Sequence, residues 1–303
     1  MAKVSTSVRS MSPDHVRRDM VTMLLGSVLT MNLFVLLVGD HYKAAIANWL
    51  LTVCSASVVL VSVMILYRQR FKGLYGRTYG AIAIGLMLWF ASEIILGGGT
   101  NTFQSIGLPA GQTQAVTGQL PAMIAEIIWL AGYGFFAYFL FKLMGHFSNS
   151  IKPKVLTMVA VATAFAALIL AQSISYYFNN DLQKTVGPEA ANGSGSVSLF
   201  FKILHPILDM LLIIPALVTM SALKDGKLTS TPWQLLSFAV LILAVQDIGD
   251  IYFSILYGIN NHWIWKMFGT VAYLCIATSL FWYNKFFIFD AKKAAKIWQE
   301  SNR

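Results

Sequence analysis

Eight long apolar runs fill most of this chain, and they constrain its fold more than any other feature. Each run is about as long as the roughly 20 residues that a helix needs to cross a bilayer. We expect transmembrane helices at residues 21–39, 44–67, 79–97, 121–143, 155–178, 199–223, 233–257 and 263–286. The runs show no alternation, which argues against strands. Charged residues make up only 12% of the chain, whereas a soluble domain has roughly 25%. The sequence therefore predicts an all-α, polytopic membrane helix bundle.

The basic residues predict how the bundle is oriented. Of the 22 Lys and Arg residues, 18 fall in the two termini and in alternate loops, and only Lys43, Lys184, Lys202 and Lys266 fall on the other side. Because basic loops stay in the cytoplasm, we expect a multi-pass cell-membrane protein with both termini cytoplasmic. Its parts would be a basic tail at 1–20, the bundle at 21–290 and a basic tail at 291–303. Within the first tail, Ser12-Pro13-Asp14 predicts the start of a short helix at the membrane surface.

An internal repeat is suggested by the spacing of a few polar and aromatic residues. Asn48 precedes Glu93 by 45 residues, and His205 precedes Asp250 by the same number. The steps Gly132-Tyr133 and Ala272-Tyr273 also occupy similar places in the fourth and eighth predicted helices. These correspondences suggest that the first four helices repeat as the last four. Such a 4+4 repeat would be parallel, with its axis along the membrane normal.

Ionisable residues inside the predicted helices are the strongest functional signal. Counted from the helix ends at 1.5 Å per residue, all six fall in the outer half of the bilayer: Glu93, Glu126, His205, Asp209, Asp247 and Asp250. His205 and Asp209 are four residues apart and share one helical face. Asp247 and Asp250, three residues apart, do the same. An Asp at a helix centre costs roughly 2.5–3.5 kcal/mol on insertion scales, so these groups should face the bundle interior.

Three interpretations of this acidic group remain open. It is a structural polar core that joins helices, or a site for an ion, a proton or a small polar ligand that enters from outside, or a metal site. Carboxylates that are buried together cannot all remain ionised, and Asp209 would stabilise the imidazolium form of His205. A metal site would combine His205 and Asp209 with His41 and His262 from outer loops. Scattered carboxylates with few histidines make a poor zinc signature, however.

Short motifs in three of the predicted helices and in one loop resemble a known family. They are Leu88-Trp89-Phe90-Ala91-Ser92-Glu93, His205-Pro206-Ile207-Leu208-Asp209, the run from Lys224 to Trp233, and Asp247-Ile248-Gly249 with Tyr252. Over about residues 44–290 the chain resembles archaeal polytopic membrane proteins and the multi-helix N-terminal sensor modules of archaeal membrane histidine kinases. The resemblance implies a helical membrane module that senses or relays a signal. In that family a kinase normally follows, and His205 stands where the motif has a tyrosine.

These observations together favour a non-enzymatic protein. The sequence contains no phosphate-binding loop, kinase signature, CxxC pair or GxSxG elbow, and it identifies no cofactor. We expect a sensor-like module or an accessory subunit of a larger membrane complex, with membrane lipids and other membrane proteins or a second copy as partners. A transporter or channel-like protein that binds a cation at the acidic group is the alternative, followed by a membrane-embedded metal hydrolase. Basic residues dispersed over several loops argue against nucleic acid as a partner.

Overall fold

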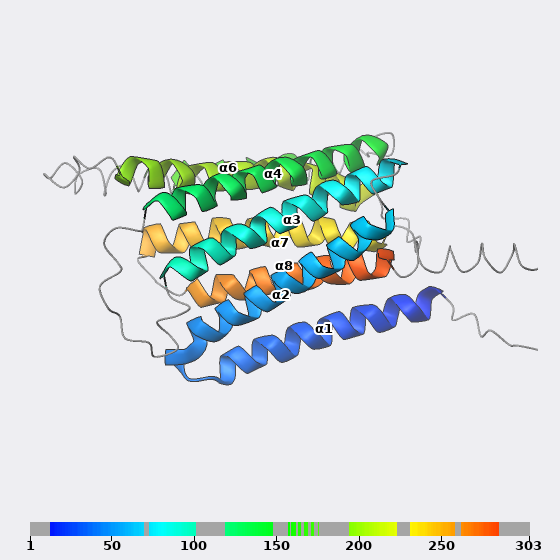
Figure 1. Cartoon of the computed structure of the whole chain (residues 1–303), viewed down its shortest axis with the longest axis horizontal. Helices are drawn as coiled ribbons and strands as arrows, with labels where there is room; N and C mark the ends of the chain where they lie inside the picture. The colour runs from blue at the N-terminus through cyan, green and yellow to red at the C-terminus, as the bar shows by residue number, and fades with distance from the viewer. Residues whose placement is uncertain are drawn as a thin grey trace, which may run out of the picture.

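The computed structural model describes residues 13–69, 73–100, 119–147, 194–222, 231–257 and 262–284, together with scattered positions between 157 and 175. Every element in these ranges is a helix. The helices are α1 (Pro13–Leu37), α2 (Asp40–Gln69), α3 (Gly73–Thr100), α4 (Gln119–Phe147), α6 (Ser194–Ala222), α7 (Thr231–Tyr257) and α8 (His262–Trp282). They lie side by side with their long axes roughly aligned (Figure 1). We call the end at which α2 begins the Asp40 end, and the opposite end the Arg68 end.

The predicted helical membrane bundle is confirmed in its class. Six helices, α1, α2, α3, α4, α7 and α8, are long and apolar enough to cross a membrane. In α6, which has 29 residues, the apolar stretch found among the described side chains is Ile207–Ser221. The predicted segment 155–178 lies largely outside the described residues, where only isolated positions between 157 and 175 are helical.

The first helix is longer than the sequence predicts. We expect a short surface helix near Pro13 and a separate span from residue 21, but α1 runs without a break from Pro13 to Leu37. Proline suits the first turn of a helix because its missing N–H has no acceptor there. No proline or glycine follows until Gly26, so nothing interrupts the helix before it enters the apolar part. The expectation of two separate helices is therefore wrong.

Six of the helices form a closed ring. In the order α2, α3, α4, α6, α7 and α8, each packs against the next, and α8 packs against α2. α1 lies outside this ring, where it contacts α2 and α8. Its large side chains are mostly exposed, with Leu29 at 61% and Leu37 at 84%, which suits contact with lipid tails. Functional side chains are therefore to be sought inside the ring.

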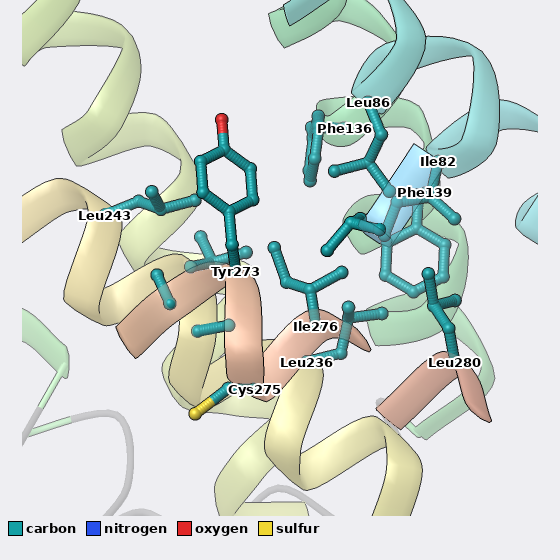
Figure 2. Packing of buried hydrophobic residues seen from close by; sticks show 14 of the residues in the cluster. Ile82, Leu86, Phe136, Phe139, Leu236, Leu243, Tyr273, Cys275, Ile276 and Leu280 are labelled. Atoms are coloured by element: carbon teal, nitrogen blue, oxygen red, sulfur yellow. The ribbon is translucent and has the colours of Figure 1, made fainter. Parts of the chain in front are cut away.

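Toward the Arg68 end, the ring is filled by aromatic and aliphatic side chains. The ring of Tyr79 from α3 stacks on that of Tyr283, just after α8, with centroids 3.8 Å apart, and lies 4.9 Å from the ring of Trp233 from α7. Ile276 and Leu280 of α8 are completely buried in the same cluster. Figure 2 shows these aliphatic side chains together, with the hydroxyl of Tyr273 pointing away from them. This half of the interior is mostly apolar, with a few buried hydroxyl groups such as those of Ser237 and Ser279.

Helices α3 and α4 approach each other closely at two glycines. A Cβ atom added to Gly85 would lie 3.2 Å from the backbone oxygen of Gly132 and 3.0 Å from the Phe136 ring. A Cβ atom added to Gly132 would collide with the Trp89 indole. The absence of side chains at these positions thus lets the indole of Trp89 lie across α4, where its N–H donates a hydrogen bond to the Trp129 carbonyl over 3.1 Å.

Substitution Gly132→Ala tests this contact. The added methyl group must displace the Trp89 ring or separate α3 from α4, and overpacking of this kind typically costs about 1–3 kcal/mol. Gly134→Ala is the matched control, because nothing lies within 4 Å of its added Cβ atom. Thermal unfolding in mild detergent should show a clear loss of stability for Gly132→Ala alone. Equal melting temperatures for the two variants would contradict the close approach.

Candidate functional site

A single tyrosine joins two of the predicted acids. The hydroxyl of Tyr133, on α4, donates a hydrogen bond to Asp209 Oδ1 on α6 over 2.7 Å. The same hydroxyl lies 3.4 Å from Asp247 Oδ2 on α7. The two carboxyl oxygens are therefore no more than about 6 Å apart, a separation at which charges interact strongly. Three neighbouring helices of the ring thus meet at one phenol.

The buried part of this acid pair lacks one hydrogen-bond donor among the described residues. Asp209 is only 3% exposed, and among the described residues no hydrogen-bond donor reaches its second, buried oxygen, Oδ2. The carboxyl group of Asp247 faces Asp209 closely enough for the two to interact directly. Two carboxylates are both acceptors, so Tyr133 alone cannot satisfy them. A proton or a cation between them would supply the missing positive charge.

A third acid, Glu93, also binds a tyrosine hydroxyl group inside the ring. The hydroxyl of Tyr273, on α8, donates to Glu93 Oε1 on α3 over 2.6 Å, and Ser55 of α2 also lies beside this carboxyl group. The other oxygen of Glu93 is buried, and no hydrogen-bond partner for it lies in the part of the chain that the structure describes. Glu93 is also close enough to Asp247 for their charges to interact. The two tyrosine–acid groups are therefore neighbours inside the ring.

His205 pairs with a different acid from the one that the sequence suggests. Its Nε2 atom lies 3.0 Å from Glu126 Oε2 on α4, a contact that is an ion pair only while the imidazole is protonated. The indole of Trp129 lies against the imidazole, with ring centroids 4.3 Å apart. His205 was expected to pair with Asp209, one turn along α6. Instead it contacts Glu126, and the carboxyl group of Asp209 accepts a hydrogen bond from Tyr133.

Lys266, at the start of α8, brings a positive charge to the same region. Its ammonium group donates a hydrogen bond to Asn48 Oδ1 on α2. The charge also interacts with the carboxyl groups of Asp250 and Glu93. Asp250 in turn interacts with Asp247. All six predicted ionisable residues thus lie in one connected polar cluster, which we call the inner polar cluster: Glu93, Glu126, His205, Asp209, Asp247 and Asp250, with Tyr133, Tyr273, Lys266 and Asn48.

The candidate metal ligands are not all brought together. His41 is exposed at the start of α2, where its ring contacts Tyr42. The side chain of His262 lies outside the described part. Among the residues that the structure describes, no group of three or more His, Cys, Asp or Glu side chains is placed to hold a metal ion.

Sequence reasoning missed four members of the cluster. Tyr133 and Tyr273 stood out only as marks of a repeat, although a phenol within a span is a natural donor to a buried acid. Lys266 counted only as one of four basic residues on the outer side. Its position one turn into a span was the available signal, since a buried ammonium group also needs a partner. Asn48 was noted only for its spacing from Glu93.

Comparison with known proteins adds no relative to this description. No protein-family model matches the chain, and no curated protein or solved structure matches it significantly.

The bridging role of Tyr133 is tested by its replacement with phenylalanine. Removing the hydroxyl leaves two buried carboxyl groups without their donor, which typically costs about 1–3 kcal/mol. Tyr67→Phe is the control, because Tyr67 is 79% exposed. Unfolding measured in mild detergent should show a loss of stability for Tyr133→Phe and little change for the control. If both variants unfold like the wild type, the phenol does not hold the acid pair together.

Proposed function

We propose that this chain is a non-enzymatic multi-pass membrane protein, a sensor-like module or an accessory subunit of a larger complex, and that it responds to a single positive charge bound between Asp209 and Asp247. That charge is a proton or a monovalent cation. The observation that carries the proposal is the buried, donorless oxygen of Asp209, which faces a second carboxyl group. Both acids lie in a membrane bundle, where an uncompensated charge is costly.

The packing of the ring interior favours a sensing function over the conduction of ions. The inner polar cluster occupies the part of the ring toward the Asp40 end, whereas aromatic side chains such as Tyr79, Tyr283 and Trp233 fill the part toward the Arg68 end. In the described residues the carboxyl groups of the cluster therefore stop inside the bundle. A bound charge would change how α4, α6 and α7 are held together, and this change would be passed to a partner.

A transporter or channel-like protein is the second candidate, and one feature of α6 favours it. Pro215 has no N–H, so the carbonyl of Leu211 lacks its usual helical donor. This free acceptor lies further along α6 from Asp209, toward the Arg68 end, and would extend a polar path. Uptake of protons or alkali cations into proteoliposomes would support transport. Binding without flux supports the sensor-like function.

The proposed architecture is an eight-helix bundle made of two four-helix halves. Matching contacts support it. Tyr133 of α4 binds acids of α6 and α7, and Tyr273 of α8 binds Glu93 of α3. Glu126 lies seven residues before Tyr133 and contacts His205 of α6. Lys266 lies seven residues before Tyr273 and contacts Asn48 of α2. The ring order α2, α3, α4 followed by α6, α7, α8 also repeats.

The sequence resemblance and the basic residues support the remaining parts of the proposal. Similarity to archaeal sensor modules favours signalling through partners, with other membrane proteins or a second copy as the candidates. The distribution of Lys and Arg places both termini in the cytoplasm and the Asp40 end outside. The inner polar cluster would then receive its proton or cation from the outer side. The basic stretch 291–299 would be available for a cytoplasmic contact.

The response to charge is tested by melting temperature as a function of pH and of alkali cation concentration. Removing the shared proton leaves two facing carboxylates, so the wild type should melt at lower temperature as pH rises, and added sodium or potassium should reverse the loss. A change of 1 kcal/mol corresponds to about 2–4 °C for a domain of this kind. Asp209→Asn should fold and show neither response, because its amide cannot titrate.

Asp40→Asn is the control for this experiment, since the carboxylate of Asp40 is exposed and pairs with Lys43. It should respond to pH and cations as the wild type does. Identical flat curves for the wild type and for Asp209→Asn would reduce the cluster to a structural polar core.

Orientation is tested with alkaline phosphatase fusions, which are active only outside the cytoplasm. A fusion after Gly187 should be active and one after Lys152 should be silent, because the loop at Lys152 has three basic residues and the loop at Gly187 has only Lys184. The reverse pattern of activity would invert the orientation and place the Asp40 end in the cytoplasm.

A further inference from the structure

A line of polar side chains runs along the contact between α4 and α6 to the acid pair. Glu126 of α4 and His205 of α6 face each other, with Oε2 and Nε2 3.0 Å apart. Both helices begin at the Asp40 end (Figure 1), and Asp209 lies one turn further along α6 than His205, on the same face. The contact between Glu126 and His205 therefore lies between the Asp40 end and the proposed charge-binding pair.

The exposed fraction of these side chains falls along the same line. The side chain of Glu126 is 24% exposed and that of His205 is 9% exposed, whereas the residue Asp209 is 3% exposed. Glu126 is thus the member of the line that is accessible from outside the ring. A proton bound for the acid pair needs carriers along the way, because an unaccompanied charge is costly inside a membrane bundle.

Neighbouring aromatic rings hold the imidazole of His205 in place. The indole of Trp129 lies against it, with ring centroids 4.3 Å apart, and the ring of Tyr133 lies roughly parallel to it, with centroids 6.1 Å apart. The hydroxyl of Tyr133 donates to Asp209 Oδ1, so this one side chain contacts both His205 and Asp209. His205 therefore has Glu126 on one side and the group of Tyr133 and Asp209 on the other.

The turn of α4 that carries Glu126 is fixed by α3. Ser92 Oγ donates a hydrogen bond to the carbonyl of Ala125 over 2.8 Å, and the indole N–H of Trp89 donates to the carbonyl of Trp129 over 3.1 Å. These two carbonyls lie on either side of Glu126 in the chain. Glu126 is thus presented to α6 by two helices that are tied together, which suits a proton donor that must stay within reach of its acceptor.

We infer that Glu126 and His205 form a proton relay that connects the outer side of the bundle with the Asp209–Asp247 pair. The O–H bond of protonated Glu126 breaks as its proton binds Nε2 of His205, and the imidazolium then releases the proton on Nδ1 to Asp209 Oδ2. Glu126 is left as a carboxylate and His205 as a neutral imidazole. The reverse sequence returns the proton and restores the first tautomer. Histidine suits this role because its two ring nitrogens gain and lose protons separately.

This inference rests on the proposed function and adds the route by which the proton arrives. The described titratable groups around His205 come from both helices that pack on α6: Glu126 and Tyr133 of α4 and Asp247 of α7, together with Asp209 of α6 itself. Acids on two sides of an imidazole are what a relay from one acid to another requires. Asp209 Oδ2 is also a buried acceptor that no donor among the described residues reaches. An imidazole passes on protons but not metal cations, so sodium reaches the pair by another route.

The test measures how fast the acid pair of the purified full chain takes up a proton. Time-resolved infrared spectroscopy follows the C=O band that is absent in Asp209→Asn, as it rises after a rapid drop in pH at low salt. The variants are His205→Gln and Glu126→Gln, whose amides keep a polar group in place but cannot pass on a proton. His41→Gln is the control, because His41 is exposed at the start of α2. Sodium binding is timed separately at high pH, from the carboxylate bands after mixing with NaCl.

In His205→Gln and Glu126→Gln the C=O band should rise at least about tenfold more slowly than in the wild type and His41→Gln, because a positioned acid or base typically speeds proton transfer by more than this. The rate of sodium binding should not change. Either variant provides the result if the other does not fold.

A band that rises as fast as in the wild type in a folded variant would overturn the relay and leave the proposed function intact. Equal slowing of proton and sodium binding would also overturn it, because the two side chains would then only shape the entrance. A wild type whose carboxyl band is absent, or responds to neither pH nor sodium, would overturn the proposed function, and this inference with it.

Discussion

The cost of placing carboxyl groups inside a membrane bundle is the constraint on which the rest of this structure depends. A carboxylate there must find a donor or a cation within the protein, because lipid tails supply neither. In this chain the donors come from helices other than those that carry the acids: the phenols of α4 and α8 serve the acids of α6, α7 and α3. Satisfying the acids therefore requires that the helices close into a ring.

The two halves of the ring interior differ in the side chains that fill them. Toward the Arg68 end, stacked rings such as Tyr79 on Tyr283 and buried aliphatic side chains give a packed core that changes little with solution conditions. Toward the Asp40 end, the inner polar cluster holds the ionisable side chains, and we propose that its stability changes with pH and with cation concentration. Arg68 of α2 adds a hydrogen bond to Asn284 beside α8 at the packed end, over 2.8 Å, which strengthens the fixed half of the α2–α8 pair.

Much of the fold follows from the sequence, whereas the site follows only in part. Apolar run length predicts the spans because the bilayer thickness is fixed, and the position of the six ionisable residues inside the bundle follows from the cost of exposing them to lipid. Which acid meets which partner depends on the order of helices around the ring, and one sequence does not contain that order. For this reason Glu126 rather than Asp209 contacts His205, and the phenol of Tyr133 was not identified as the bridge.

The central claim is that Asp209 and Asp247 hold one exchangeable positive charge between them. Infrared difference spectroscopy of the protein in lipid measures this directly, through the C=O stretching band of a protonated, buried carboxyl group. At low salt the wild type should show such a band, which disappears as pH rises or as sodium is added, and which is lost in Asp209→Asn. A spectrum without a protonated carboxyl band, or with a band that neither pH nor sodium changes, would contradict the account.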